Sequence, residues 1–82
     1  MAMPKLPQVS GESVLRLLRS LGYETVRQKG SHVTVRLEVG GVERSITVPT
    51  HRVVAKGALS DILSEAGVCT GVSREELVRQ LG

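Results

Sequence analysis

The chain has 82 residues and a mass of 8.8 kDa, so we expect one small domain over residues 1–82, without room for a second catalytic domain or a deep substrate pocket. Apolar residues make up 40% and charged residues 23%, which is typical of a chain that folds and excludes intrinsic disorder. Tyr23 is the only Phe, Tyr or Trp, which excludes a multi-ring stacking platform for nucleic acid, so binding of nucleic acid must be electrostatic.

The net charge of +3 is concentrated in the first two thirds of the chain. Residues 1–56 hold nine basic and four acidic side chains, whereas residues 57–82 hold two basic and four acidic ones. The first part is therefore the better candidate for facing phosphate groups. The single cysteine cannot form an internal disulfide, and no segment has the length and apolar character of a membrane span or a secretory signal. We expect a soluble, cytoplasmic protein.

The chain begins with an expected extended lead-in over residues 1–9, which contain two prolines and little periodicity. Ser10 is a typical N-cap, and apolar residues recur after it at spacings of three and four. This pattern predicts an amphipathic helix over residues 11–21. Gly22 is the residue type at which helices end in a left-handed conformation, so the helix is expected to stop there.

Three strands are predicted next. The segment 23–28 is rich in β-branched residues, and from 32 to 39 apolar and polar residues alternate, as in a strand with one buried face. A glycine pair at 40–41 suits a two-residue hairpin turn into a third strand, which Pro49 ends. This turn predicts a register with the cross-strand pairs His32–Pro49, Val33–Val48, Thr34–Thr47, Val35–Ile46, Arg36–Ser45, Glu38–Glu43 and Val39–Val42, and directs Val33, Val35, Leu37 and Val39 towards the core.

Two helices complete the chain. Apolar residues at spacings of three and four predict an amphipathic helix over residues 56–66, bounded by Gly67. Cys69 then falls in a loop. A capping-box sequence predicts a short third helix over residues 74–81.

The predicted order α-β-β-β-α with a further short helix is that of an α+β fold. A three-stranded antiparallel sheet offers one apolar face and each helix one apolar stripe, so the helices are expected to pack on one face of the sheet. The chain then divides into the lead-in 1–9, a core over residues 10–67, and a linker with a terminal helix over residues 68–82. The other sheet face stays open and carries His32, Thr34, Arg36 and Thr47.

Several chemistries are excluded by the residue types available. Two histidines and one cysteine do not supply the ligands of a zinc site, and no glycine pattern matches a phosphate-binding loop or a dinucleotide fingerprint. We therefore expect no metal site and no cofactor. A Cys–His hydrolase would need Cys69 beside a histidine, but no supporting signature surrounds it, and the simpler interpretation of Cys69 is a small apolar side chain.

His32 is the main candidate for a catalytic residue. Imidazole gains and loses a proton near neutral pH, so it can accept a proton from a ribose 2′-OH or donate one to a leaving oxygen. The alternative is a solvent-facing strand histidine without a role. Candidate RNA-binding residues near it in the sequence are Arg27, Lys29, Ser31 and Arg36, together with the backbone N–H groups of the turn at 29–31.

His51 is a second candidate, either as an acid/base group or as a phosphate ligand near the start of the second predicted helix. The alternative is a loop histidine that contacts only backbone or water. Two further candidate RNA-binding residues, Arg52 and Lys56, follow it. A basic stripe would combine them with Arg16, Arg19, Arg27 and Lys29, although such side chains are also ordinary solvated surface.

Several motifs of the chain occur together at set distances: a capped, leucine-rich helix from Ser10 to Leu18, the segment from Tyr23 to Gln28, Gly-Ser-His at 30–32, Val-Pro-Thr-His at 48–51, Lys-Gly-Ala-Leu at 56–59, Ile-Leu at 62–63 and Ala-Gly at 66–67. In this combination, over residues 5–67, the chain resembles the HicA family of toxins from bacterial toxin–antitoxin pairs. The placement of Gly-Ser-His between two predicted strands makes the combination more specific than the triplet alone.

The resemblance implies a fold like that of double-stranded-RNA-binding domains, in agreement with the element order inferred from the residues. It implies a ribonuclease that stops translation by cleaving mRNA, which is a single-stranded RNA. It further implies that His32 is the catalytic histidine and that no metal is needed. It also implies a HicB-like antitoxin as the inhibiting partner, which we expect to cover the face that carries His32.

Two other functions remain open. The same topology suits a non-catalytic RNA-binding module, because RNA helices are bound by shape through phosphate and 2′-OH contacts. A protein-interaction adaptor would use the positive charge for an acidic partner and would bind RNA negligibly at physiological salt. For the ribonuclease, an open site with few base-reading groups predicts weak sequence preference.

Overall fold

The computed structural model describes residues 6–81, and the expectation for the first part of the lead-in, residues 1–5, lies outside them. The elements follow in the order α1 (Gly11–Ser20), β1 (Glu24–Lys29), β2 (His32–Val39), β3 (Val42–Pro49), α2 (Lys56–Thr70) and α3 (Arg74–Leu81). The predicted α+β fold, consistent with that of double-stranded-RNA-binding domains, is therefore confirmed.

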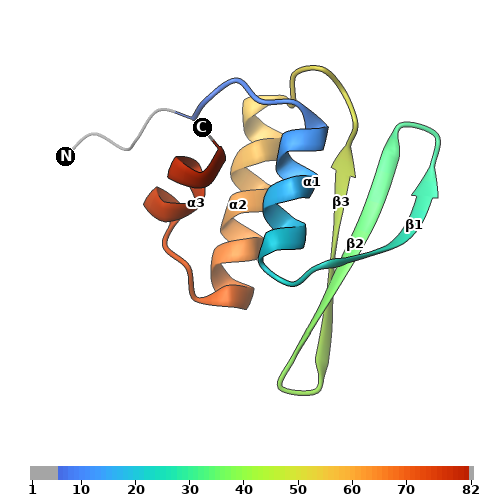
Figure 1. The fold of residues 1–82 in the computed structure, drawn as a ribbon, viewed down its shortest axis with the longest axis vertical. Coiled ribbons are helices and arrows are strands. Elements are labelled where there is room, and N and C mark those ends of the chain that lie inside the picture. Colours follow the sequence, from blue (N-terminus) through green and yellow to red (C-terminus); the bar gives the residue numbers. More distant parts are fainter. Residues whose placement is uncertain (1–5, 82) are drawn as a thin grey trace.

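The molecule has two layers. The three helices lie together on one side of the sheet, and both α1 and α2 contact β3 (Figure 1). The core between the layers is entirely apolar and draws on every helix and on the two hairpin strands. Its most completely buried members are Val14, Leu18, Val35, Val48, Val54, Leu59, Leu63 and Leu77. The opposite face of the sheet is uncovered, as predicted.

Local sequence explains the first helix. The Ser10 side-chain oxygen accepts a hydrogen bond from the backbone N–H of Ser13 at 3.2 Å, which satisfies one of the free donors at the start of α1. At the other end, Leu21 closes the last turn and Gly22 has φ of 106°, a value that glycine adopts without steric cost. α1 thus ends within one residue of its predicted end.

The register of the β2–β3 hairpin is the predicted one. All seven predicted cross-strand pairs are present, with His32 opposite Pro49 at one end and Val39 opposite Val42 at the other. Gly40 and Gly41 have φ of 58° and 80°, as a type I′ turn requires. Since alternate residues of a strand point to opposite faces, this register decides which side chains of β2 reach the open face.

β1 carries an irregularity that the sequence pattern did not predict. Its pairing with β2 shifts between Thr25 and Arg27, so Val26 is an extra, bulged residue. Because of this bulge, Arg27 pairs with Thr34 and shares the open face with it, rather than facing the helices. The sheet order is β1-β2-β3, which makes β2 the central strand.

Two expectations about the far ends of the elements are wrong. α2 does not end before Gly67 but continues to Thr70, and the left-handed terminating residue is Gly71, with φ of 75°. Cys69 therefore lies in the last turn of a helix and not in a loop. Val39 is not in the core but 46% exposed, because the tip of the hairpin extends beyond the helical layer (Figure 1).

The third helix is part of the same packed unit. Leu77 is completely buried and Leu81 is buried beside it in the common core. The Arg74 guanidinium donates hydrogen bonds to the carbonyl oxygen of Ser60 and to the hydroxyl of Ser64, at 3.1 and 2.6 Å, which joins the start of α3 to α2.

Tyr23 precedes β1 and is only 2% exposed, and its hydroxyl has no hydrogen-bond partner among the described residues. Burial raises the pKa of this phenol far above its ordinary value of 10.0, and the neighbouring Cys69 and Glu65 add to the shift. The folded chain therefore keeps the phenolic proton at a pH where the unfolded chain releases it.

We predict that Tyr23→Phe reduces the loss of unfolding free energy with rising pH in the alkaline range. Above about pH 10 the parent should lose up to about 1.4 kcal/mol of unfolding free energy per pH unit relative to the variant, because only its unfolded state ionises this phenol. At neutral pH the variant should be equally stable or about 1 kcal/mol more stable, since a buried hydroxyl without a partner is removed. Urea unfolding at pH 8, 9, 10 and 11 measures both effects, and parallel pH profiles would contradict the prediction.

Candidate functional site

The candidate site lies at the end of the sheet where the β1–β2 turn and the β3–α2 loop meet. His32 is the first residue of the central strand, with Lys29 of β1 as its pairing partner on one side and Pro49 of β3 on the other. Its side chain is exposed on the open face, as predicted. A histidine in this position is held by two neighbouring strands and remains accessible to a large substrate.

His51 is brought to the same end of the sheet by three hydrogen bonds to the backbone. Thr50 donates from its N–H and from its hydroxyl to the carbonyl oxygen of Ser31, at 2.7 and 3.0 Å. The N–H of Gly11, at the start of α1, donates to the carbonyl oxygen of His51 at 2.9 Å. These bonds tie the β3–α2 loop to the β1–β2 turn and to the first helix.

As a result, the two histidines lie close together. The centroids of the His32 and His51 rings are 6.5 Å apart, and the ring planes meet at 67°. The sequence identified both residues separately but did not predict that they are neighbours. A phosphate oxygen forms a hydrogen bond with a ring nitrogen at about 2.6–3.2 Å. A phosphate group placed between the two rings can therefore contact both of them.

An open hollow of about 470 Å³ adjoins His32 on the uncovered sheet face. It is lined by Arg27, Lys29, His32 and Thr34. The bulge in β1 is responsible for this arrangement, because it directs Arg27 to the same face as Lys29. Two of the predicted RNA-binding cations thus lie beside the predicted catalytic histidine.

A second hollow of about 440 Å³ lies around His51, at the end of the sheet. It contains one more predicted residue, Arg52, together with Ser10, Glu12, Gln28 and Thr50. Glu12, Gln28 and Thr50 were not predicted from the sequence to belong to the site, and Ser10 was predicted only as a helix cap. Their only sequence signal is proximity to a motif: Thr50 lies between Pro49 and His51, and Gln28 between two cations.

Some of the basic side chains have a partner within the molecule and others do not. Arg36, Arg44 and Arg79 form ion pairs of 3.3–3.6 Å with Glu43, Glu65 and Glu76, and Arg74 is hydrogen-bonded to α2. Within residues 6–81, no ion pair or side-chain hydrogen bond involves Arg16, Arg27, Lys29, Arg52 or Lys56. Apart from Lys56, these cations line the hollows on the two faces and at the end of the sheet.

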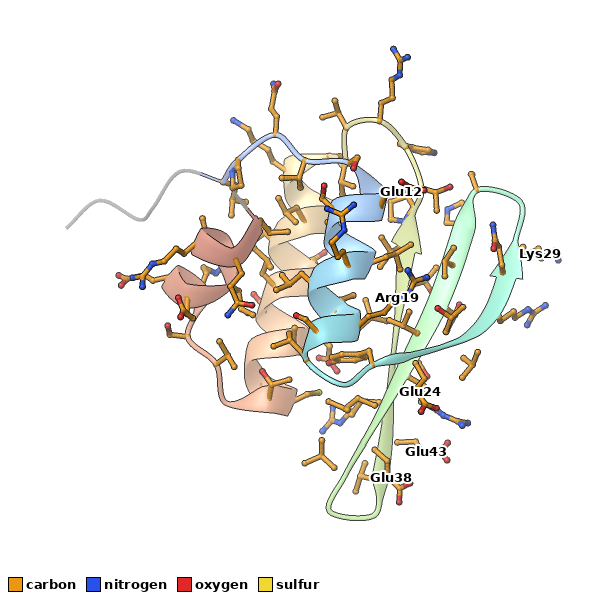
Figure 2. The ribbon with its side chains drawn as sticks, in the orientation of Figure 1. Glu12, Arg19, Glu24, Lys29, Glu38 and Glu43 are labelled. Carbon is orange, nitrogen blue, oxygen red and sulfur yellow. The ribbon has the colours of Figure 1, made fainter. Side chains whose placement is uncertain are left out.

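Acidic side chains gather at the opposite end of the sheet. Figure 2 shows Glu38 and Glu43 at the tip of the β2–β3 hairpin, away from Lys29, which lies at the β1–β2 end. At the β1–β2 end, Arg27, Lys29 and Arg52, which are unpaired within residues 6–81, outnumber the one carboxylate that lines the hollows there, Glu12, whereas at the hairpin Glu43 is paired with Arg36. This separation favours phosphate binding beside His32 and His51.

Two of the predicted RNA-binding residues are not brought into this cluster. Arg36 shares the open face but lies four residues along β2 from His32, about 13 Å away, and is paired with Glu43. Lys56 begins α2 and lines neither the hollow beside His32 nor the one around His51. Within residues 6–81, the hydroxyl of Ser31 makes no hydrogen bond. The backbone carbonyl oxygen of Ser31 accepts the two hydrogen bonds from Thr50.

Cys69 lies far from both histidines. It lines a small hollow with Val39 and Val42 at the hairpin end of the molecule, and its thiol donates to the Glu65 carboxylate at 3.7 Å. The geometry therefore gives no support to a Cys–His pair. Among residues 6–81, no three His, Cys, Asp or Glu side chains converge as a group that could hold a metal ion. No helix in the same range has the length and apolar character needed to cross a membrane.

Comparison with known proteins gives one match. The profile of the family described as HicA toxin of bacterial toxin-antitoxin matches residues 11–68, from the start of α1 to the last turns of α2. This range includes both histidines and every hollow residue named above except Ser10 and Cys69. No curated protein and no solved structure gives a significant match.

Gly11 decides how closely α1 approaches the His51 loop. A Cβ at this position would overlap the carbonyl oxygen of Pro49 and lie 2.7 Å from Cα of Thr50, so only glycine fits without movement. We predict that Gly11→Ala lowers the unfolding free energy by about 1–3 kcal/mol and shifts the ring resonances of His51 and His32 in NMR spectra.

Gly57→Ala is the matched control, because nothing lies within 4 Å of a Cβ at Gly57 and the residue is in the first turn of α2. It should be neutral or stabilise the chain by up to about 1 kcal/mol and leave both histidine resonances in place. Equal effects of the two substitutions would show that the close approach of α1 does not position the histidines.

Proposed function

Because the chain belongs to the HicA toxin family of bacterial toxin–antitoxin systems, a family of mRNA interferases, we propose that it is a metal-independent endoribonuclease that cleaves mRNA and so stops translation. The observation that carries this proposal is the pair of histidines, 6.5 Å apart, among cations that have no partner within residues 6–81. In this proposal His32 transfers the proton and basic side chains hold the phosphate.

His32 acts as a general base on the ribose 2′-OH or as a general acid towards the 5′-oxygen that leaves. In the reaction the 2′-oxygen loses its proton and forms a bond to phosphorus, while the P–O5′ bond breaks and the 5′-oxygen gains a proton; the products are a 2′,3′-cyclic phosphate and a 5′-OH. Such proton transfer contributes about 10²–10⁴-fold to the rate. The position of His32 supports this role, because it lies on the open face where an RNA strand has access.

Lys29 and Arg27 stabilise the charge that gathers on the phosphoryl oxygens. They line the hollow beside His32, and neither has a competing partner among the described residues. Positioned cations of this kind are a large source of rate enhancement, comparable with proton transfer. Of the remaining candidates, Arg52 is placed to bind a neighbouring phosphate, whereas Arg36 and Lys56 contribute at most to long-range attraction.

His51 is the complementary group. It takes the second proton-transfer role on the opposite side of the phosphate, or it binds the phosphate directly. Its distance from His32 and its anchoring through Thr50 and Gly11 support a role in the same reaction. Two histidines provide both an acid and a base, so the proposal needs neither a metal ion nor an organic cofactor.

The substrate is single-stranded RNA. Only one Phe, Tyr or Trp is present, and Tyr23 is buried, so no such ring is available to stack on bases at the open face. Binding there relies on phosphate contacts, which are available along any flexible strand. We place this activity in the cytoplasm, where mRNA is translated.

A toxin of this family has an antitoxin partner. We propose a HicB-like protein that covers the open face around His32 and blocks the entry of RNA. Carboxylates of such a partner would form ion pairs with Arg27 and Lys29, the same unpaired cations that bind phosphate. Inhibition would then be direct competition for one surface.

Cleavage of end-labelled single-stranded RNA in EDTA tests the enzymatic part of the proposal. We expect cutting by the parent, a loss of about 10²-fold or more in rate with His32→Ala, and a smaller loss with His51→Ala. Glu38→Ala is the control, because it alters the same face of β2 at the far end of the strand and should cut like the parent.

The kinetic pattern of His51→Ala separates its two roles. A fall in kcat indicates proton transfer, whereas a rise in KM alone indicates phosphate binding. If the parent binds RNA but never cuts it, and His32→Ala binds equally well, the chain is a non-catalytic RNA-binding module. If RNA binding itself is negligible at physiological salt, the adaptor function is correct instead.

Histidine accessibility tests the proposed mode of inhibition. In a purified, inhibited complex with a HicB-like antitoxin, we expect His32 to be protected from diethyl pyrocarbonate, with the modification of each histidine read by mass spectrometry. The free chain should be modified at both His32 and His51, since both side chains are exposed. Full reactivity of His32 in an inhibited complex would rule out direct coverage.

A further inference from the structure

A third hollow lies on the helix side of the sheet, between α1 and β1. It has a volume of about 290 Å³, near the lower end of the range of about 300–1,000 Å³ for small-molecule pockets. Leu15 of α1 and Val33 of β2 lie at its bottom, but they are only 4% and 3% exposed, so the apolar floor is narrow. Its polar rim consists of Glu12, Arg16, Arg19, Gln28 and Thr50. We call it the α1–β1 groove.

The bulge in β1 accounts for the polar groups of this groove. After the bulge, Arg27 and Lys29 point to the open face, and Gln28 between them points to the helix side. Gln28 pairs with Val33, whose side chain is buried beneath the helices. A side-chain amide, which both donates and accepts hydrogen bonds, is thereby placed at the edge of an apolar floor.

Arginines on the α1 side supply positive charge. Arg16 makes no ion pair or hydrogen bond with any residue from 6 to 81, and the single interaction of Arg19 is a hydrogen bond of 3.2 Å to the hydroxyl of Thr25. Figure 2 shows Arg19 on the side of α1 that is turned towards the strands. Both guanidinium groups are exposed and available to a phosphate group or to the face of a base.

The groove continues into the catalytic site. Glu12, Gln28 and Thr50 line both the α1–β1 groove and the hollow around His51. His51 is in turn 6.5 Å from His32 on the open face. Two of the hollows thus share part of their lining, and the histidine pair places the hollow beside His32 next to them; we call the three together the track.

We propose that the α1–β1 groove binds a nucleotide of single-stranded RNA that flanks the scissile phosphate, and that it reads the base. The base enters above the narrow floor, with Gln28 and Glu12 hydrogen-bonded to its edge. The Arg19 guanidinium lies against its face, while Arg16 holds the adjoining phosphate. This inference rests on the proposed ribonuclease function, and it names the part of the substrate that the site recognises.

The chemistry of the groove favours an RNA base over a free anion. A guanidinium plane can stack on a flat aromatic ring, and an amide beside a carboxylate suits the hydrogen-bonding edges of such a ring. A carboxylate at the rim would repel a free phosphate but accepts hydrogen bonds from base N–H groups. The groove thus gives the site the base selectivity that the open face lacks, contrary to the weak preference expected from the sequence.

Binding of non-cleavable RNA tests the inference separately from catalysis. The probes are hexanucleotides of A, C or U with 2′-fluoro groups in place of every 2′-OH, and their affinities are measured by fluorescence anisotropy at several salt concentrations. Arg16→Ala should weaken binding of all three probes and reduce the log–log salt slope by about 0.7, the value for one phosphate contact on a single strand.

Gln28→Leu should leave this slope unchanged and change the ratio of affinities among the three probes by about five-fold or more, as expected from the loss of a base-edge hydrogen-bonding pair. Arg79→Ala, the charge-matched control on α3, should behave like the parent. The groove proposal is overturned if Arg16→Ala and Arg79→Ala weaken binding equally, or if Gln28→Leu preserves every affinity ratio.

The outcomes for the groove and for catalysis are distinguishable. If the parent cuts RNA in a His32-dependent manner while the groove variants bind the probes like the parent, the groove proposal fails and the ribonuclease proposal stands. If the parent never cuts RNA but the groove variants change binding as described, the groove is an RNA site and the catalytic proposal fails.

Discussion

Thr50 donates two hydrogen bonds, from its backbone N–H and from its hydroxyl, to the carbonyl oxygen of Ser31 at 2.7 and 3.0 Å. Ser31 directly precedes His32, and Thr50 directly precedes His51. One acceptor atom therefore couples the positions of the two histidines. Each such bond contributes only about 0.5–1.5 kcal/mol to stability, but together they hold Thr50, the first residue after β3, against Ser31, the residue before β2.

The first helix reinforces this coupling through backbone contacts. The N–H of Gly11 is one of the donors at a helix start that have no partner within the helix, and it finds one in the carbonyl oxygen of His51. The same glycine allows α1 to lie against the backbone of Pro49 and Thr50. The site is thus supported by a helix, a turn and a strand end, although its side chains come from exposed segments.

Periodicity predicted the part of the site that lies on regular structure. Alternation in β2 and the glycine pair at 40–41 determine the hairpin register, and the register places His32 on the open face opposite Pro49. The bulge at Val26 was not predictable in this way, because one extra residue in a short, exposed strand leaves no mark on the pattern. The end of α2 was misplaced for a similar reason: Gly67 adopts a helical conformation, and only Gly71 has the positive φ that ends the helix.

The proximity of the two histidines lay beyond sequence reasoning for a different physical reason. It depends on hydrogen bonds between residues 19 positions apart, Ser31 and Thr50, and on a contact between α1 and the loop after β3. Threonine and glycine are common in loops, so their types alone do not indicate such contacts. Local patterns therefore predicted the candidate residues, whereas their arrangement came from the tertiary fold.

The two faces of the sheet contribute different properties to one track. Cations on the open face attract any phosphate chain and cannot distinguish sequences, whereas the α1–β1 groove offers Gln28 and Glu12 beside an apolar floor. If RNA follows the track, the scissile phosphate lies at the end of the sheet, between the face that attracts the strand and the groove that reads it. An inhibitor then needs to cover only this end of the sheet. With the two histidines covered, RNA bound to the open face cannot reach the α1–β1 groove.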